Sequence, residues 1–142
     1  MPGNMSNYLV KKVLDDLLGN GAFTPPATIY LALFHTAGPG DNNANVANEI
    51  TDVDTAYARV ACTWDAAVLA DRKALLAALT QFAIATDDYD GDVVAWGLYD
   101  SVTRLGGNLL FWGEWQTPRE ILQNDRFEAD EDDLELGCTA TA

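Results

Sequence analysis

The sequence predicts a mainly β fold, an antiparallel, jelly-roll-like β-sandwich with an N-terminal α-helix. The first observation is the stretch Val93–Trp115, where two runs rich in β-branched and aromatic residues flank a polar segment ending in Gly106-Gly107-Asn108. Glycine and asparagine accept the positive φ of a hairpin turn, so we expect two central strands here. The second observation is a series of short apolar runs between turn residues, and the third is a helical repeat confined to residues 6–18. A chain of 142 residues fits one domain, 1–142, with its β part at about 24–137.

Residues 6–18 predict one amphipathic helix. Ser6 can cap its N-terminus, and Gly19-Asn20-Gly21 supplies the stop. The apolar residues recur at helical spacing and form a broad stripe: Leu9, Val10, Val13, Leu14, Leu17 and Leu18. Such a helix either packs on its own β core or docks on a partner subunit.

A strand and a long loop follow. Thr28–Phe34 is a nearly continuous apolar run after Pro25-Pro26, which favours a strand covered on both faces. The polar stretch His35–Thr55 is rich in Gly, Asn and Asp. A loop of this length in a compact domain is usually functional or mobile, so we interpret it either as a contact with a neighbouring subunit or as a flexible segment.

The middle of the chain mixes strand and helix signals. Tyr57–Trp64 alternates like a half-buried strand, which would place Ala58, Val60, Cys62 and Trp64 on one face. Residues 65–79 are rich in Ala and Leu, and propensity alone predicts a helix there, although tertiary context can make it a strand. Gln81–Ala85 predicts another strand that leads into an acidic turn, Asp87–Asp92.

Alternation within the central hairpin assigns side chains to faces. Val94, Trp96 and Leu98 are expected on one face, and Leu109, Phe111 and Trp115 on one face of the partner strand. Thr117-Pro118 predicts a corner. After it we expect a short strand at 120–123, a turn at Asn124-Asp125, and a closing edge containing Phe127 and Leu134–Leu136. The seven acids of residues 125–135 suit an edge strand, because charge discourages edge-to-edge pairing.

Charge excludes two classes of partner. The chain has 8 Lys and Arg against 22 Asp and Glu, a net charge of −14, and its cations form no basic stripe. Binding to nucleic acid or to an anionic membrane needs clustered cations, so neither is expected. The N-terminus lacks a signal peptide pattern and no apolar run approaches the ~20 residues of a membrane span, so we expect the protein to be made and kept in a cytoplasm. Cys62 and Cys138 are too few for a disulfide framework, and we expect both thiols to be reduced.

The sequence predicts no metal, cofactor or catalytic site. Asp87, Asp88, Asp90 and Asp92 surround Gly91, but their spacing does not match a calcium-binding EF-hand loop, and a solvated acidic turn is favoured. A second acidic set, Glu128 and Asp130–Asp133, has no ligand periodicity. The single histidine, His35, has no recognisable nucleophile motif beside it and is interpreted as a loop residue. No Gly-rich nucleotide-binding motif is present.

The order of several motifs resembles a family of small β-rich virion proteins of tailed bacteriophages, often labelled tail-fibre or minor structural proteins. The matching segments are Met5–Leu9, Pro26–Phe34, Tyr57–Val60, Trp96–Asp100, Gly107–Gly113 and Thr117-Pro118. Two features depart from that family: residues 65–79 are Ala- and Leu-rich instead of short and rich in Ser, Thr and Gly, and Met1–Asn4 look like an extension. The resemblance implies a structural role and brings no catalytic residues.

From the resemblance we expect a non-enzymatic virion protein, first of all a capsid decoration (cement) subunit that binds and stabilises the assembled shell. The alternative is a tail fibre, neck or baseplate subunit. The expected partners are the major capsid protein or tail components, together with further copies of the chain in a homo-oligomer. The expected contacts are the helix, the loop Thr36–Thr55 and the strand edges. A further alternative is a carbohydrate-binding module for host attachment, suggested by Trp64, Trp96, Trp112 and Trp115 on a β scaffold.

Overall fold

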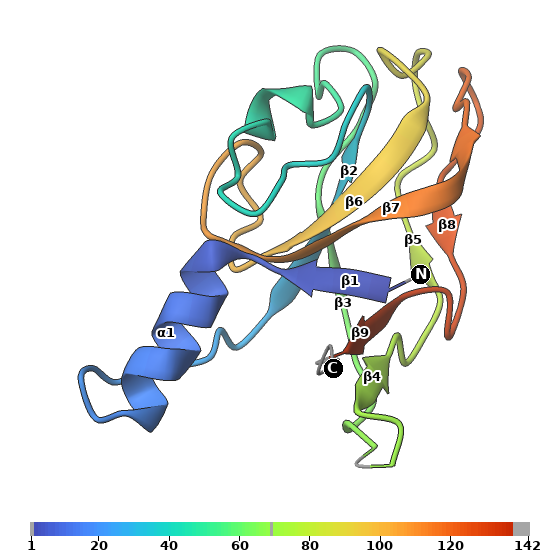
Figure 1. The fold of residues 1–142 in the computed structure, drawn as a ribbon. Coiled ribbons are helices and arrows are strands. Elements are labelled where there is room, and N and C mark those ends of the chain that lie inside the picture. Colours follow the sequence, from blue (N-terminus) through green and yellow to red (C-terminus); the bar gives the residue numbers. More distant parts are fainter. Residues whose placement is uncertain (1, 69, 138–142) are drawn as a thin grey trace.

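The computed structural model describes residues 2–68 and 70–137, and it confirms a mainly β fold with an N-terminal helix (Figure 1). The helical elements are α1 (Asn7–Leu17) and the short 3₁₀ turn η1 (Val46–Asn48). The strands are β1 (Pro2–Met5), β2 (Ile29–Phe34), β3 (Val60–Cys62), β4 (Lys73–Leu75), β5 (Thr80–Gln81), β6 (Val93–Tyr99), β7 (Leu109–Arg119), β8 (Glu128–Ala129) and β9 (Glu135–Gly137). Among the described residues, no helix has the length and apolar character needed to cross a membrane.

One mixed sheet organises the protein. Its seven strands lie in the order β3-β2-β6-β7-β1-β9-β4, and the predicted hairpin β6–β7 is near its centre. All neighbouring pairs are antiparallel except β1 and β9, which run parallel. Strands β5 and β8 form a separate two-stranded ribbon. The sheet is curled, so that β1 continues it alongside β7 while the far strands β9 and β4 lie at an angle to the long strands β2 and β6 (Figure 1).

The two ends of the curled sheet are joined by residues just beyond β3 and β4. Trp64 and Leu76 form an antiparallel bridge. The amide of Asp65 donates to the carbonyl of Leu75 at 3.0 Å, and the amide of Ala77 donates to that of Thr63 at 2.9 Å. These bonds satisfy backbone groups that an open edge would leave unpaired.

Side chains from the central strands enter two apolar clusters, one on each side of the sheet. The main core includes Leu31, Leu33, Trp96, Leu98, Phe82, Phe127 and Leu134. The second core consists of Ala32, Phe34, Ala95, Tyr99 and Leu109. Consecutive residues of β2 therefore alternate between the two cores, which confirms the prediction of a strand covered on both faces.

The second core is covered by the loop that follows β2. The phenol of Tyr99 donates to Asn43 Oδ1 at 2.6 Å, and the indole Nε1 of Trp112 donates to Asp41 Oδ1 at 2.8 Å. Gly38 lies so close to Trp112 that an added Cβ would come within 2.9 Å of the indole ring. The loop 35–55 is therefore packed on its own sheet, which argues against the interpretation of it as a flexible segment.

The described residues of the stretch Met1–Asn4, which looks like an extension relative to the family, are built into the sheet as part of β1. Asn4 pairs with Trp112 of β7, and Gly3 pairs with Leu136 of β9. The absence of a side chain on Gly3 allows this strand to cross the Trp96 indole, since a Cβ would come within 2.5 Å of Cη2. A four-residue strand containing Pro and Gly carries no strand pattern of its own, so only its partners reveal it.

The helix that propensity favours at 65–79 is not formed. The described residues of this stretch make a turn, with Arg72 at φ 55°, and then β4, which pairs with β9. Leu76 is completely buried in the main core and bridges to Trp64. Packing and closure of the sheet override the helical preference of Ala and Leu, which amounts to only tenths of a kcal/mol per residue.

Irregular pairing changes two of the face assignments in the hairpin. Trp96, Leu98, Phe111 and Trp115 point into the main core as predicted. Register shifts between Val93 and Ala95, and between Leu98 and Tyr99, turn Val94 and Leu109 to the second core instead. Thr117-Pro118, where we predicted a corner, lies within β7, but it falls inside the first register shift, between Glu114 and Arg119, where a proline is tolerated.

Other strands differ in extent from the predictions. β3 covers only Val60–Cys62, and Ala58 is exposed while Tyr57 and Arg59 are buried, so the assumed buried face is wrong at its start. β5 is limited to Thr80–Gln81, and residues 120–123 form no strand. The turn at Asn124-Asp125 is present, with Asn124 at φ 70°. β9 is not a closing edge, since it lies between β1 and β4.

Candidate assembly surface

Helix α1 is attached to the sheet at its N-terminal end. Ser6 caps the helix by accepting a hydrogen bond from the amide of Leu9 at 3.1 Å, and its own amide donates to Leu110 of β7 at 2.8 Å. The amide of Asn7 donates to the carbonyl of Asp41 in the loop 35–55 at 2.9 Å. From this fixed base the helix points away from the sheet (Figure 1).

The apolar stripe of α1 is largely left in solvent. Leu9 is the one buried residue of the helix. Four residues of the stripe are exposed, and more so near the tip: 38% for Val10 and 50% for Leu14, against 76% for Leu17 and 72% for Leu18 at the C-terminal cap. Leucines scattered singly on a surface are ordinary, but a contiguous apolar stripe on a projecting helix is typical of a docking surface. We predicted that this helix either packs on its own core or docks on a partner subunit. Only the base of the helix, at Leu9, packs on the core.

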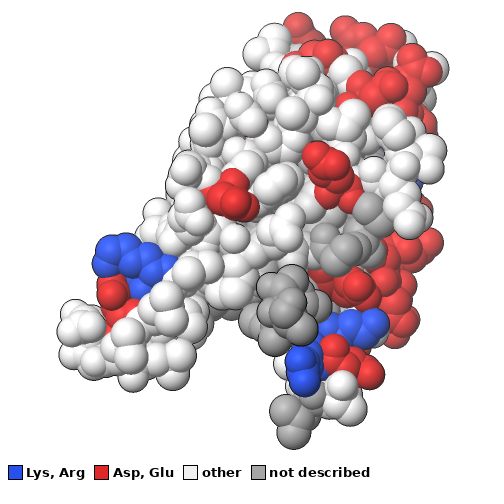
Figure 2. Space-filling view, viewed as in Figure 1, with Lys and Arg blue, Asp and Glu red and all other residues white. Residues whose placement is uncertain are grey.

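The surface charge is divided between two regions (Figure 2). Acidic side chains gather along the side of the molecule formed by the far ends of the long strands and the turns near them. On helix α1 a blue area lies next to a smaller red one, and the rest of the helix surface is uncharged. Lys11, Lys12, Asp15 and Asp16 cancel one another, so the whole net charge of −14 lies outside α1.

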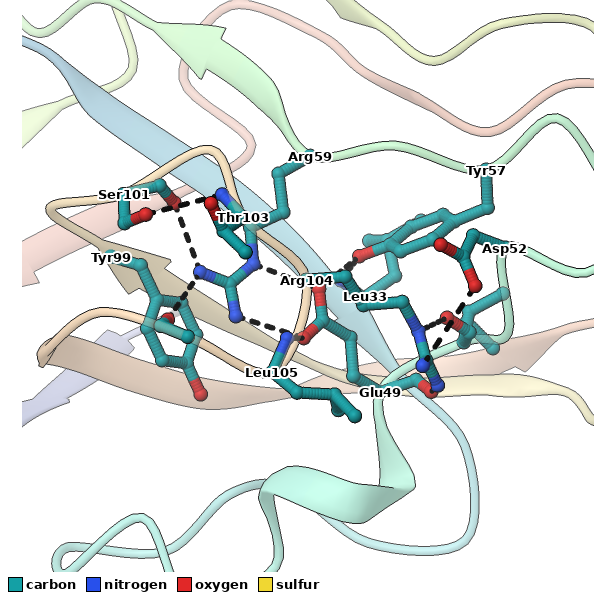
Figure 3. Close-up of polar contacts among 12 residues, drawn as sticks. Leu33, Glu49, Asp52, Tyr57, Arg59, Tyr99, Ser101, Thr103, Arg104 and Leu105 are labelled. Carbon is teal, nitrogen blue, oxygen red and sulfur yellow. Dashed lines mark hydrogen bonds and ion pairs between the residues drawn. The ribbon is translucent and has the colours of Figure 1, made fainter.

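A buried ion pair joins the loop 35–55 to the chain before β3 (Figure 3). The Nε and Nη2 atoms of Arg59 each donate to one carboxylate oxygen of Glu49 at 2.8 Å, and both side chains are completely buried. Tyr57 Oη and the amide of Leu105 also donate to this carboxylate, at 3.0 and 2.9 Å. Each carboxylate oxygen therefore accepts two hydrogen bonds, which offsets the cost of burying the charge.

The same arginine holds the connection between β6 and β7. Its Nη1 donates to the carbonyl oxygens of Ser101 and Gly106, both at 2.9 Å, and its Cζ lies 3.8 Å from the centre of the Tyr99 ring. Arg104 donates to the backbone carbonyls of Glu49 and Ile50 at 2.8 and 2.7 Å. We call Glu49, Tyr57, Arg59 and Arg104 the Glu49–Arg59 clasp. It ties three separate loops together, and its groups are engaged with one another, as in a structural network.

The sequence interpretation missed the clasp because it treated Arg59 as one of eight scattered cations. A usable signal was present. Arg59 interrupts the apolar alternation of Tyr57–Trp64, and its side chain lies on the face that also carries the buried Tyr57. A charge within such a pattern requires a buried partner, but the sequence does not show which of 22 acids it is.

We expect the fold to lose stability in alkali because buried phenols resist ionisation. Burial raises the pKa of Tyr89 to about 12, and burial, with the nearby Glu49, raises the pKa of Tyr57 well above its usual value. The pKa of Tyr99 is raised mainly by burial. In the unfolded chain these phenols ionise near pH ~10. Above that pH the unfolded state has released protons that the folded state still holds, so stability is complete below about pH 10 and falls as pH rises towards 12.

The measurement is a pH titration over this range, in which the loss of the native circular dichroism and the rise of tyrosinate absorbance should occur together. Tyrosinate appearing for all five tyrosines while the dichroism stays native would contradict the prediction.

Two carboxylates of the predicted acidic turn accept hydrogen bonds from segments distant in the chain. Asp88 Oδ1 accepts from the amide of Gln123 at 2.7 Å, and Asp90 Oδ1 accepts from the amide of Thr51 at 3.1 Å. Asp90 Oδ2 also lies 3.2 Å from His35 Nε2, and Nδ1 of that ring lies 2.8 Å from Thr36 Oγ1. His35 thus links the loop 35–55 to the acidic turn. Within 2–68 and 70–137, no group of three or more His, Cys, Asp or Glu is arranged to hold a metal ion.

The second acidic set is dispersed around β8 and β9. Glu128 accepts from Gln81 Nε2 at 2.8 Å, and Asp133 Oδ2 accepts from the amide of Asp130 at 2.8 Å. Glu135 pairs with Lys73 at 3.1 Å across the β4–β9 ladder.

Cys62 is buried with a free thiol, and burial raises its pKa to about 11. Cys138 lies outside the described residues.

The four tryptophans do not form a row of exposed rings. Trp96 is completely buried, and Trp64 and Trp115 pack at the margin of the main core. Trp115 lies 5.1 Å from the ring of Phe127, and Trp112 packs against the second core beneath the loop 35–55. Rings engaged in packing do not offer a flat face for stacking on a sugar, so the arrangement does not favour the carbohydrate-binding alternative.

Comparisons with known proteins identify the family. The family described as podophage GP4 fiber I protein gp80 matches residues 4–137, which include α1, every strand from β2 to β9, the clasp and the loop 35–55. A comparison with curated proteins finds no match for the chain. Because the match spans nearly all of the 142 residues, the chain belongs to the podophage GP4 fiber I protein gp80 family.

Proposed function

We propose that this protein is a non-enzymatic structural subunit of a phage virion and that it serves in a fibre. The observation that carries the proposal is the family match over residues 4–137, since the family is described as a fibre protein. The surface supports it. The projecting α1 carries an apolar stripe that is suited to contact with another protein, and the polar groups of the clasp and of the acidic turn are occupied in holding loops together.

Capsid decoration is the second candidate. It is favoured by the absence of an internal sequence repeat, because an extended fibre shaft is commonly built from repeats, whereas a compact subunit suits attachment at many points of a lattice. A subunit that binds the assembled shell and not the free capsid protein would stabilise the shell by mass action.

Imaging intact particles by electron cryomicroscopy, at a resolution that identifies side chains, distinguishes the two. Copies of this fold in a fibre attached to the tail are the expected result. Copies in a fixed ratio to the major capsid protein over the whole shell would reject the fibre role in favour of decoration. Particles that contain no copy at all would overturn the structural role itself.

A further inference from the structure

The charges of α1 oppose the helix that carries them. A helix is stabilised by acids near its N-terminus and by bases near its C-terminus. Here the first turn has no acid, the last turn has no base, and Asp15 and Asp16 lie close to the negative C-terminal end. Lys11 forms an ion pair with Asp15, but lysine before an acid at this spacing is the weaker order. Residues that violate a local rule frequently serve an interaction outside the element.

The sequence of α1 is symmetric when its charges are reversed. Residues 10–17 read apolar, Lys, Lys, apolar, apolar, Asp, Asp, apolar. Read backwards, the apolar positions coincide and each lysine is replaced by an aspartate. Two copies of such a helix that run antiparallel bring the lysines of each against the aspartates of the other, and the apolar residues of each against those of the other. A two-fold contact has this property, since residue i meets j and j meets i.

We propose that α1 is a self-docking helix, which packs antiparallel against α1 of a second copy of this chain. The inference rests on the proposed structural function and names the partner of its surface. The exposed residues Val10, Leu14 and Leu17 form the contact, and Leu14 lies near the two-fold axis. Lys11 of each copy faces Asp15 of the other along the border of the apolar stripe. The antiparallel arrangement also sets the two helix dipoles in opposition, which removes the unfavourable placement of the aspartates.

The charge distribution permits two copies to associate through α1 and disfavours association through the acidic surfaces of the chain. Copies with a net charge of −14 repel each other, but α1 itself is neutral. Because the helix is attached at its N-terminal base, antiparallel pairing places the two acidic sheets at opposite ends of the pair.

The contact is small. Eleven residues make a helix about 16 Å long, so a pair buries less than the roughly 1,200 Å² of a stable interface. We therefore expect weak self-association in solution, which many copies on one particle would reinforce.

Sedimentation velocity of the intact chain over a range of concentrations tests the contact. The wild type is expected to shift towards a dimer as concentration rises, and Leu17→Asp is expected to remain monomeric. Val53→Asp is the matched control, since Val53 is 67% exposed in the loop 35–55 and lies outside α1. Leu17 is itself 76% exposed, so its replacement leaves the fold intact, which circular dichroism would verify. A wild type that stays monomeric at the highest attainable concentration, or equal dimerisation of Leu17→Asp and wild type, would overturn the inference.

Charge exchange tests whether the partner of α1 is a second α1. The variant Lys11→Asp/Lys12→Asp makes α1 wholly acidic, and Asp15→Lys/Asp16→Lys makes it wholly basic. Each alone is expected to dimerise less than wild type, and an equal mixture is expected to form mixed dimers at least as well as wild type. Failure of the mixture to associate would reject a second α1 as the partner.

Disulfide trapping tests the orientation. With Cys138 replaced by Ser and Cys62 protected by burial, Val10→Cys and Leu17→Cys variants are mixed under mild oxidation. The antiparallel pair predicts bridges between the two variants, whereas a parallel pair predicts bridges within each and would contradict the proposal. These results are separate from the virion test: a protein located in the fibre whose Leu17→Asp variant sediments like wild type would leave the proposed function standing and remove only the self-docking helix.

Discussion

Replacing Arg59 with alanine is expected to lower the free energy of unfolding by about 3–5 kcal/mol. The cause is the carboxylate that remains. Glu49 is completely buried, and Arg59 supplies two of its four hydrogen bonds and the only opposite charge within the clasp that contacts the carboxylate directly. The substitution also releases the carbonyls of Ser101 and Gly106 and removes the cation from the Tyr99 ring. Urea unfolding followed by tryptophan fluorescence measures the loss.

Two comparison variants separate the buried charge from lost packing. Arg126→Ala removes a partly exposed arginine that lies 4.0 Å from Glu128, and it should cost less than about 1 kcal/mol. The double change Arg59→Met/Glu49→Leu removes both charges, and it should be less damaging than Arg59→Ala, because no unpaired charge remains. A double variant that is no more stable than Arg59→Ala would show that the charge pair is not what makes Arg59 important.

Replacing Trp96 with alanine is expected to cost a similar amount, about 3–5 kcal/mol, through loss of apolar burial and the cavity left behind. Trp96 is completely buried on β6 at the centre of the sheet. Its indole ring supports β1, because Gly3 crosses directly over Cη2. Without the ring, β1 would lose the side chain against which it packs. Loss of hydrogen-exchange protection at residues 2–5, in addition to a lower urea midpoint, is the expected signature.

Trp96→Phe provides the graded control. Phenylalanine retains most of the apolar contact and removes an indole N–H for which the described structure shows no hydrogen-bond partner. The expected cost is below about 1.5 kcal/mol. If Phe were as damaging as Ala, the ring's exact shape and not its burial would govern the site. If Ala were harmless, the assignment of Trp96 to the main core would be wrong.

The sequence by itself determined the elements whose signals are local. The cap at Ser6 and the four-residue spacing of Leu9, Val13 and Leu17 suffice to place α1 to within one residue at each end. The two long strands of the hairpin and β2 are equally local, since their β-branched and aromatic runs have few alternatives. The broad apolar stripe that identifies α1 as the candidate assembly surface is also visible in the sequence, although its exposure is not.

Only the tertiary structure decided the features that depend on distant partners. Pro2–Met5 become a strand because β7 and β9 lie on either side, and the Ala- and Leu-rich residues after Trp64 become strand and turn because the ends of the curled sheet meet there. Bulges in the hairpin moved Val94 and Leu109 to the other face, and the choice of Glu49 as the partner of Arg59 required contacts ten residues apart in the chain. In each case a local preference of tenths of a kcal/mol is outweighed by burial and by hydrogen bonds between segments that the sequence does not place side by side.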